Sequence, residues 1–283
     1  MTGIDDNSSL LVRRFDIKRI RDGRPERIVD TVATEEPLDI RVSYWFKDVT
    51  HTQSLALTMR TPGHDRELAA GLLLSEGVIR GAEDLVDLRV LGAEPSNEIV
   101  AELARDVDLD AWKLQRNTVV NSSCGVCGKR SREAIAWPDY GAANGDALIA
   151  EASLIDQLPS LLAEQQKAFS KTGGLHAAAL VNPQGRIEQL FEDIGRHNAL
   201  DKLVGSCLLQ GRLPLRDRIL FLSSRSSFEL IQKTVMAGAP AIATVGGPSS
   251  LAIETARDFG LTLLGFVRER RFNVYSGDWR INS

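Results

Sequence analysis

The chain has 283 residues, of which 43% are hydrophobic and 25% are charged, a composition typical of soluble globular domains. Lys and Arg number 34 against 38 Asp and Glu, and this net charge of −4 excludes a general attraction to nucleic acid or anionic lipid. No apolar run approaches the roughly 20 residues of a membrane-spanning helix, and the polar N-terminus has no signal-peptide pattern. We therefore expect a cytoplasmic protein with neither a nucleic acid nor a membrane as a partner.

The first part of the chain predicts a small α+β domain over residues 28–116, behind an N-terminal arm over residues 1–27. The arm is polar and charged, and we expect it to be loose, with one strand at residues 12–20. Alternating apolar residues and one helical pattern follow. The expected elements are strands at 38–44, 55–59, 85–91 and 98–103 and a helix at 66–76.

Residues 151–283 show a different order of expected elements, in which strands alternate with helices. This order predicts a mostly parallel sheet covered on both faces, so the fold class is α/β, with a three-layer α/β/α second half. The expected helices are at 153–166, 197–209, 228–236 and 251–259, and the expected strands are at 176–181, 187–191, 219–222, 241–245 and 261–267.

The segment between these two parts, residues 117–150, is rich in Ser, Gly, Asn and Asp, and we expect it to be an exposed and flexible connection. It contains Cys124-Gly-Val-Cys127, in which two thiols lie close enough to share a metal or to exchange a disulfide. Three basic residues directly after the pair would lower a thiol pKa and favour the nucleophilic thiolate. The third cysteine, Cys207, lies in an apolar run and is expected to be a packed helical thiol.

A zinc site is the plain alternative for a Cys-x-x-Cys pair, but it needs two further ligands. The chain has no second close cysteine pair, and its four histidines are scattered along the sequence. A zinc deaminase would need a His-x-Glu segment and a Pro before the cysteines. Neither His51 nor His64 has a Glu two residues later, and no Pro precedes Cys124. Redox and sulfur chemistry stay open for the pair, and we expect no structural metal.

Two junctions between a strand and a helix in the second half carry residue types that bind phosphate. The first offers hydroxyl groups with Arg225 and Ser226, and the second offers Gly246 and Gly247. In a parallel sheet both junctions lie at the edge where ligands bind, so together they indicate a long ligand with several phosphates. Helix capping alone is the alternative for either junction.

A basic stretch after the last expected strand should reach the same edge, where its arginines could contact a ligand rather than only solvent. Two histidines, His176 and His197, flank the expected hairpin of this domain. Each could position a ligand, or could be a satisfied core or capping residue. The residues of the basic stretch are Phe266, Val267, Arg268, Glu269, Arg270 and Arg271.

Several motifs, taken in order, resemble those of the formate dehydrogenase accessory sulfurtransferase family, FdhD. They run from about residue 28 to residue 275 and are Ser-Cys124-Gly-Val-Cys127-Gly, Thr172-Gly-Gly-Leu-His-Ala, Glu192-Asp-Ile-Gly-Arg-His-Asn-Ala-Leu-Asp-Lys, Ala237-Gly-Ala-Pro and Gly265-Phe-Val-Arg, ending in Asn273-Val-Tyr.

Two motifs depart from the family pattern. Where the family reads Ser/Thr-Gly-Arg, this chain has Ser223-Ser-Arg, and where it often reads Ser-Arg-Ser-Ala-Pro, this chain has Thr244-Val-Gly-Gly-Pro. The arginine of the second motif is therefore missing.

The resemblance implies a sulfurtransferase that takes persulfide sulfur from a cysteine desulfurase. It would pass this sulfur to the molybdenum bis-guanine-dinucleotide cofactor before the cofactor enters formate dehydrogenase. Cys124 and Cys127 match the family's cysteine pair, with Cys124 as the carrier, and residues 266–271 match its cofactor-binding stretch. The nucleotide-binding edge falls on the two junction loops, where GDP-like nucleotides would bind as well. The family's second domain is similar to the cytidine deaminase fold without its zinc site.

Two other classes of function fit parts of the sequence. A chaperone could hold the molybdenum cofactor without sulfur chemistry, its cysteines serving as an oxidation sensor or metal site. A zinc-dependent hydrolase acting on nucleotides would bind about one zinc ion per chain. A homodimer is the expected assembly.

Overall fold

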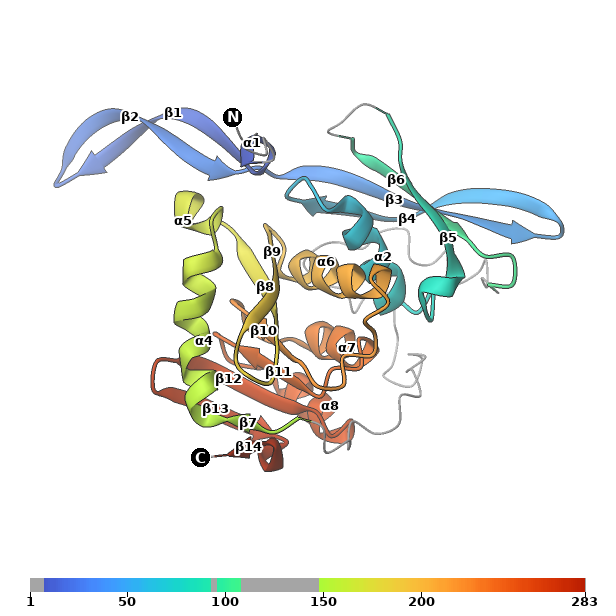
Figure 1. The fold of residues 1–283 in the computed structure, drawn as a ribbon. Coiled ribbons are helices and arrows are strands. Elements are labelled where there is room, and N and C mark those ends of the chain that lie inside the picture. The colour runs from blue at the N-terminus through green and yellow to red at the C-terminus, as the bar shows by residue number, and fades with distance from the viewer. Residues whose placement is uncertain (1–7, 93–95, 108–147, 283) are drawn as a thin grey trace, which may run out of the picture.

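The structure, a computed structural model, describes residues 8–92, 96–107 and 148–282 (Figure 1). Its helices are α1 (Ser8–Leu11), α2 (Asp65–Ser75), α4 (Ala152–Gln165), α5 (Phe169–Thr172), α6 (Arg196–Leu209), α7 (Phe228–Met236) and α8 (Ser250–Asp258). Single 3₁₀ turns lie at Ala82–Asp84 and Asp278–Arg280. None of these helices combines the length and the apolar composition that crossing a bilayer requires.

Within the described part of the chain, the strands form four sheets. The strands of the first part are β1 (Val12–Arg21), β2 (Arg24–Ala33), β3 (Glu36–Phe46), β4 (Val49–Arg60), β5 (Leu85–Val90) and β6 (Glu98–Leu103). The strands of the second part are β7 (Ala150–Glu151), β8 (His176–Val181), β9 (Ile187–Asp193), β10 (Ile219–Leu222), β11 (Ala241–Thr244), β12 (Thr262–Arg268), β13 (Arg271–Ser276) and β14 (Ile281–Asn282). Each expected helix and strand of the two main parts is present, most with small shifts at the ends, whereas β4 begins at Val49, six residues before the expected strand at 55–59.

The second part is built on a six-stranded sheet with the order β13-β12-β11-β10-β8-β9. Apolar side chains on one face of this sheet pack against α6, α7 and α8, and those on the other face pack against α4. The α/β class with a three-layer second half is therefore confirmed. The similarity to the cytidine deaminase fold stays a prediction.

The expectation of a mostly parallel sheet is wrong, because only β10, β11 and β12 run parallel to one another. Strand β8 pairs antiparallel with both β9 and β10, and β13 pairs antiparallel with β12. Short turns join β8 to β9 and β12 to β13, and a short turn can join only antiparallel strands. The sequence reading ended the sheet at β12, and so placed the arginines beyond the last strand. Arg271 instead begins β13, in which Phe272 and Val274 alternate with polar residues.

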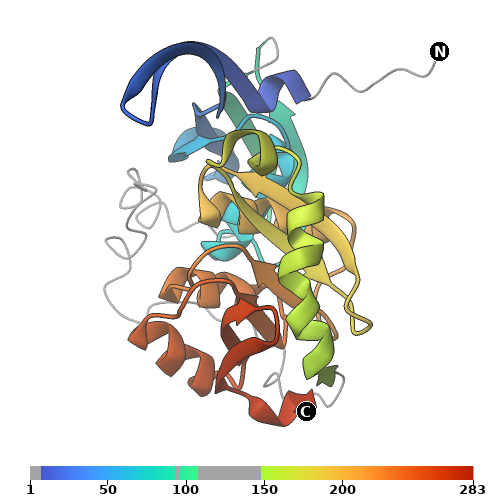
Figure 2. The ribbon, with the colours of Figure 1, turned by 90° about the vertical axis from the view of Figure 1, so that its left-hand side faces the viewer.

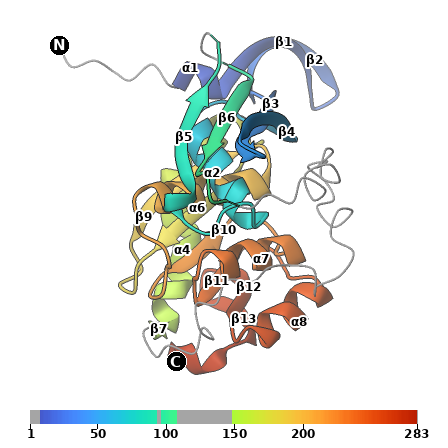
Figure 3. The ribbon, with the colours of Figure 1, turned by 90° about the vertical axis from the view of Figure 1, so that its right-hand side faces the viewer.

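The first part consists of a mixed four-stranded sheet, with the order β4-β3-β6-β5, and helix α2. Helix α2 lies between this sheet and α6 (Figure 3). Apolar residues of both sheets and of α2, α6 and α7 belong to one hydrophobic cluster. The domain boundaries proposed from the sequence stay a prediction, but the two parts bury their apolar surfaces together.

A two-stranded antiparallel ribbon, β1 with β2, precedes this sheet and stands at the end of the molecule far from the C-terminus (Figures 1 and 2). The sequence reading expected one strand here and missed β2, whose Pro25 and charged residues conceal its alternation. Asp22 and Gly23 form the turn, both with a positive φ (50° and 76°), as a two-residue hairpin turn requires.

Helices α2 and α6 approach each other through two glycines. A Cβ atom on Gly71 would lie 2.0 Å from the carbonyl oxygen of Asp201, and one on Gly205 would lie 1.9 Å from that of Glu67. No carbon atom can approach an oxygen so closely. The contact between the two halves therefore depends on the absence of a side chain at both positions.

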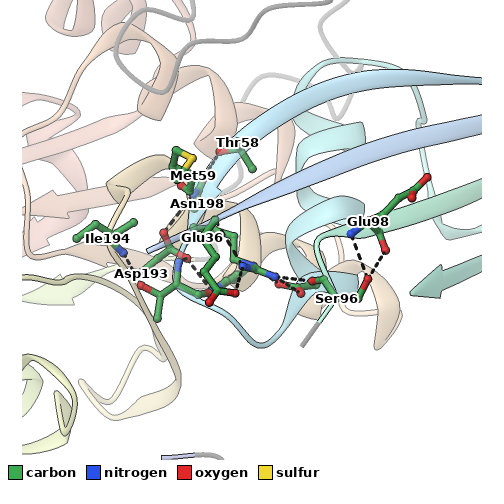
Figure 4. Close-up of polar contacts among 12 residues, drawn as sticks. Glu36, Thr58, Met59, Ser96, Glu98, Asp193, Ile194 and Asn198 are labelled. Atoms are coloured by element: carbon green, nitrogen blue, oxygen red, sulfur yellow. Dashed lines mark hydrogen bonds and ion pairs between the residues drawn. The ribbon is translucent and has the colours of Figure 1, made fainter. Parts of the chain in front are cut away.

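A buried polar network joins the end of β4 to the start of α6 (Figure 4). The ammonium group of Lys202 lies 2.7 Å from a carboxylate oxygen of Asp193 and donates to the carbonyl oxygen of Thr61 at 2.8 Å. Asn198 donates to Asp193 and to the carbonyl oxygen of Met59. Lys202 and Asp193 are both fully buried, so each charge depends on the other.

We expect Gly205→Ala to lower the free energy of unfolding by about 1–3 kcal/mol, the usual cost of overpacking. Alanine in a helix is favoured over glycine by about 1 kcal/mol, so a net loss would show that the close approach dominates. Denaturant unfolding measures the difference. Gly174→Ala is the control, because a Cβ there has its nearest neighbour at 3.7 Å. A Gly205→Ala protein as stable as wild type would contradict the packing account.

Lys202→Met should cost about 3–5 kcal/mol, since it leaves the Asp193 carboxylate buried without its partner. Adding Asp193→Asn to this variant should recover part of the loss, because the remaining group is uncharged and can still accept hydrogen bonds. Arg89→Met is the control. It breaks the exposed pair of Arg89 with Glu102, and such pairs contribute about 1 kcal/mol or less. Equal losses for Lys202→Met and Arg89→Met would argue against a structural role for the buried pair.

Candidate functional site

The polar residues singled out in the second half lie along one edge of the six-stranded sheet. Leu222 at the end of β10 is level with Thr244 at the end of β11. Because β8 runs in the opposite direction, its first residue, His176, lies just beyond Leu222 at the same edge. The candidate site therefore spans the carboxyl ends of the parallel strands and the start of β8, where open α/β sheets bind ligands.

The loops after β10 and β11 run side by side and are joined by backbone hydrogen bonds. The amide of Gly246 donates to the carbonyl oxygen of Ser224 at 2.9 Å, and that of Ser249 donates to Ser226 at 3.0 Å. A Cβ atom on Gly246 would lie 2.5 Å from Cγ of Arg225. Glycine at this position, where the sequence departs from the family pattern, thus lets the Arg225 loop lie directly against its neighbour.

Phe266 lies against the second loop in a strained conformation. Its φ is +53°, in the left-handed region, which costs a residue with a Cβ about 1–2 kcal/mol. A Cβ atom on Gly247 would lie 2.5 Å from the ring of Phe266, which is 42% exposed. The ring therefore fits closely over a bare stretch of backbone at the edge of the sheet. Backbone strain of this kind is concentrated at functional sites.

The hairpin from β12 to β13 carries the rest of the basic stretch. Arg268 ends β12 and donates to the carbonyl oxygens of Val245 and Val267, which ties the hairpin to the β11 loop. Glu269 and Arg270 form the turn, and Glu269 accepts a hydrogen bond from Ser160 of α4. The exposed side chains at this tip are Arg268, Glu269, Arg270 and Arg271. The side chain of Val267 is buried in the core, so only its backbone can meet a ligand.

Ser226 is the polar residue at this edge whose hydroxyl lacks a partner. The residue is 2% exposed, and its Oγ makes no hydrogen bond with the described residues. A buried hydroxyl left without a partner costs roughly 1–3 kcal/mol. Ser226 lies two residues before the first residue of α7, Phe228, and the first backbone amides of a helix have no partner within that helix. A phosphate oxygen is a group that would satisfy such a hydroxyl.

His197 lies at the start of α6, with its Nε2 3.4 Å from Oγ of Ser227 and 3.9 Å from a carboxylate oxygen of Glu229. Burial, together with the positive charges of Lys233 and Arg196, lowers its pKa to about 4. Burial and Arg196 also lower the pKa of His176 below its ordinary value. Both imidazoles are therefore neutral at pH 7, and can form hydrogen bonds at the site without adding charge.

Other residues of the motif at 192–202 serve the fold. Asp193 accepts hydrogen bonds from the backbone amides of Thr61 and Gly195 and pairs with Lys202, so its contacts are internal to the fold. Glu192 accepts hydrogen bonds from the first amides of the short helix α5. The sequence reading included Ser227 in the first junction loop but missed Glu229, although an acidic residue in the first turn of a helix is common.

Cys124 and Cys127 lie outside the described residues. Within residues 8–92, 96–107 and 148–282, no three His, Cys, Asp or Glu side chains come together as a metal site requires. The cysteine that the structure does describe, Cys207, is fully buried in α6, as expected, and burial raises the pKa of its thiol to about 11. Cys207 is thus unsuited to nucleophilic chemistry.

Known proteins resemble this chain over nearly its whole length. The FdhD/NarQ family model matches residues 33–282. "Sulfur carrier protein FdhD" of Streptomyces avermitilis is 44% identical over 278 residues, which is 96% of each chain. The protein of the same name from Saccharolobus solfataricus is 39% identical over 270 residues, 95% of this chain and 98% of the other.

A crystal structure described as a formate dehydrogenase accessory protein from Desulfotalea psychrophila shares the fold. Its TM-score is 0.71 at 24% identity, and the match covers 96% of this chain and 100% of that one. The resemblance seen in the ordered motifs is therefore confirmed by both the family model and the curated relatives. The chain belongs to the FdhD/NarQ family of sulfur carrier proteins.

Proposed function

We propose that the protein carries sulfur as a persulfide on Cys124 and delivers it to the molybdenum bis-guanine-dinucleotide cofactor, its substrate, on the way to formate dehydrogenase. Membership of a family whose curated relatives are sulfur carriers supports the sulfur chemistry. A cysteine desulfurase in the cytoplasm is the proposed donor. One structural observation supports the binding of the cofactor. The hydroxyl of Ser226, which lies among the loops at the sheet edge, has no hydrogen-bond partner in the described residues.

The loading step needs a thiolate at Cys124. This thiolate attacks the terminal sulfur of the donor's persulfide, so that a new S–S bond forms and the donor's cysteine leaves as a thiolate. Lys129, Arg130 and Arg132 follow the cysteine pair in the sequence, and their positive charge favours the thiolate. No external oxidant is required, since the sulfur transferred is already at the persulfide level.

Cys127 has a role in release. Its thiolate can attack the sulfur of Cys124 itself, which forms a disulfide between the two cysteines and expels hydrosulfide towards the cofactor. The two electrons that reduce the outer sulfur come from oxidation of the two cysteine sulfurs to this disulfide, and an external thiol must then reduce the disulfide before the next cycle.

The nucleotide part of the cofactor is proposed to bind at the sheet edge. The hydroxyl of Ser226, the guanidinium of Arg225 and the amides at the start of α8 suit phosphate oxygens. No acidic side chain lies in the first turn of α8, so an anion meets no repulsion there. The exposed ring of Phe266 offers a surface on which a base can stack, and the neutral His176 and His197 offer hydrogen bonds. GDP should bind the same edge.

The carrier step is tested by intact-protein mass spectrometry after incubation with a cysteine desulfurase and cysteine. We expect a gain of one sulfur atom in wild type that a reductant removes, no gain in Cys124→Ala, and a gain that persists longer in Cys127→Ala. Cys207→Ala is the matched control and should load like wild type, because that thiol is buried. Absence of loading in wild type, with GDP binding intact, would favour the cofactor-holding chaperone instead.

Ser226→Ala tests the nucleotide site by calorimetric titration with GDP. We expect a Kd about 3–10-fold higher, the effect of one hydrogen bond, and a melting temperature that does not fall. The control is Ser276→Ala, whose hydroxyl donates to the carbonyl oxygen of Leu261 at 2.7 Å. That variant should lose stability and keep its affinity for GDP. Unchanged GDP affinity in Ser226→Ala would remove the Ser226 hydroxyl from the proposed site.

A further inference from the structure

Arg196 is a half-buried cation at the sheet edge that has no partner in the described residues. It is the first residue of α6, which packs against β8 and β9 (Figure 1). Within the part of the chain that the structure describes, its guanidinium group takes part in neither a hydrogen bond nor an ion pair. The buried Arg60, by contrast, pairs with Asp65 at 2.9 Å. A guanidinium group that is partly removed from water and lacks an anionic partner attracts an anion.

Two neutral histidines lie near this guanidinium group. His176 begins β8 opposite Asp193 of β9, three residues before Arg196, and His197 directly follows Arg196. Burial lowers the pKa of both imidazoles, and the charge of Arg196 lowers the pKa of each further, as a cation close to the rings must. A neutral imidazole can donate one N–H to an anion without adding a charge of its own.

The carboxylate of Glu229 restricts how an anion can be held here. It lies 3.9 Å from Nε2 of His197, the same nitrogen that is 3.4 Å from Oγ of Ser227. This carboxylate would repel an anion held by His197 alone, whereas a guanidinium group supplies a full positive charge and five N–H donors. The attraction must therefore come from Arg196, and the histidines direct the bound group.

The cluster of Arg196, His176 and His197 lies far along the edge from the ring of Phe266. Phe266 belongs to β12, whereas His176 begins β8 and Arg196 follows β9, so three to four strand spacings separate them in the sheet order. At about 4.8 Å for each spacing, the separation along the edge is about 14–19 Å. The loops proposed to bind phosphate follow β10 and β11, which lie between the two ends. A ligand whose base stacks on Phe266 therefore meets Arg196 with its opposite end.

We propose that Arg196, with His176 and His197, forms an oxyanion subsite that binds the terminal oxygen ligands of the cofactor's molybdenum. This inference rests on the proposed function, since it takes the dinucleotide cofactor as the ligand of the sheet edge. The base and the phosphates occupy one end of the edge, and the metal group is the anionic part that remains for the other. Oxygen bound to molybdenum accepts hydrogen bonds and carries negative charge, as a phosphate oxygen does, which suits a guanidinium group. Such hydrogen bonds hold the metal group by its oxygen ligands and leave the metal itself open to incoming sulfur.

Calorimetric titration of the full-length protein with tungstate, whose metal-bound oxygens resemble those on molybdenum, tests the subsite. Saturating GDP is present, so that the phosphates of the nucleotide compete for any shared position. We expect tungstate to bind the GDP-loaded wild type. Arg196→Gln should raise the Kd for tungstate roughly 10-fold or more, the effect of losing a charge-assisted hydrogen bond, and should leave the Kd for GDP unchanged. No binding to wild type, displacement of tungstate by GDP, or full affinity in Arg196→Gln would overturn the proposal.

Arg186→Gln is the matched control. Arg186 is an exposed arginine in the turn between β8 and β9, at the opposite edge of the sheet, so its loss changes the net charge equally without touching the cluster. This variant should keep the wild-type Kd for tungstate, and an equal loss of affinity in both variants would reduce the effect to overall charge and overturn the proposal. Arg196→Lys keeps the charge but not the planar fork, and its affinity should lie between those of wild type and Arg196→Gln.

The melting temperature separates a binding role of Arg196 from a structural one. Without ligand, Arg196→Gln should melt no lower than wild type, because in the described residues the guanidinium group has no partner to lose. A melting temperature that falls as far as that of Lys202→Met would identify Arg196 as a residue of the fold and overturn the proposal.

Anomalous diffraction at the tungsten absorption edge, from crystals grown with GDP and tungstate, locates the ion directly. We expect a peak within hydrogen-bonding reach of Arg196 in wild type and none there in Arg196→Gln. A peak only at the exposed tip of Arg268, Arg270 and Arg271 would mark an adventitious ion and overturn the proposal. Sulfur loading of Cys124 and binding of GDP, measured on the same preparations, report on the proposed function separately. Their failure beside intact tungstate binding at Arg196 would remove the proposed function and leave an oxyanion subsite, whereas the reverse result would remove the subsite alone.

Discussion

The close contact between α2 and α6 determines the shape of the whole molecule. Gly71 and Gly205 bring the two helix backbones together, and the Asp193–Lys202 pair fixes the end of β4 beside the start of α6. Dispersion and hydrophobic burial act over the whole shared cluster, but these two features decide the separation and the register of the halves. The start of α6, which carries His197, is positioned by the same contacts. The candidate site thus depends on packing that lies well beneath it.

The motif at 192–202 contains residues that support the core and a residue that faces the candidate site, and their burial distinguishes the two. Asp193, Asn198 and Lys202 face the interior and exchange hydrogen bonds with β4, whereas His197 turns toward Ser227 at the sheet edge. Neighbouring positions at the start of a helix point in different directions, so one short motif can serve both the core and the site. The pairing of Lys233 with Asp201 extends the buried part of this arrangement to α7.

Much of the second half could be predicted from the sequence, because its strands are short apolar runs separated by helices of clear period. β10 and α7 have the predicted bounds. The hairpin of β8 with β9 was expected, but the antiparallel pairing of β8 with β10 and the existence of β13 were not, because periodicity detects neither the direction of a strand nor the short turn before β13. The second strand of the ribbon, β2, was not predicted for another reason. Half of its ten side chains are exposed and none is buried, and Pro25 and the charged residues conceal the alternation.

The candidate site also has features that the sequence can indicate and features that only the structure shows. Arg225, Ser226, Gly246 and Gly247 could be proposed from the sequence because glycine and hydroxyl residues between a strand and a helix are typical of phosphate-binding loops. The unpartnered hydroxyl of Ser226 and the left-handed backbone of Phe266 need coordinates to be seen. Val267 was included by its place in a motif, but its side chain belongs to the core.

The shared core also limits how this architecture can evolve. A four-stranded sheet and α2 without α6 would expose the buried leucines of α2, such as Leu68 and Leu73, to water. Neither half can therefore be transferred to another protein as a ready-made module, and gene fusions can add material only at the ends or in loops. The two halves must be inherited together, so a substitution on one side of the helix contact constrains what its counterpart can become.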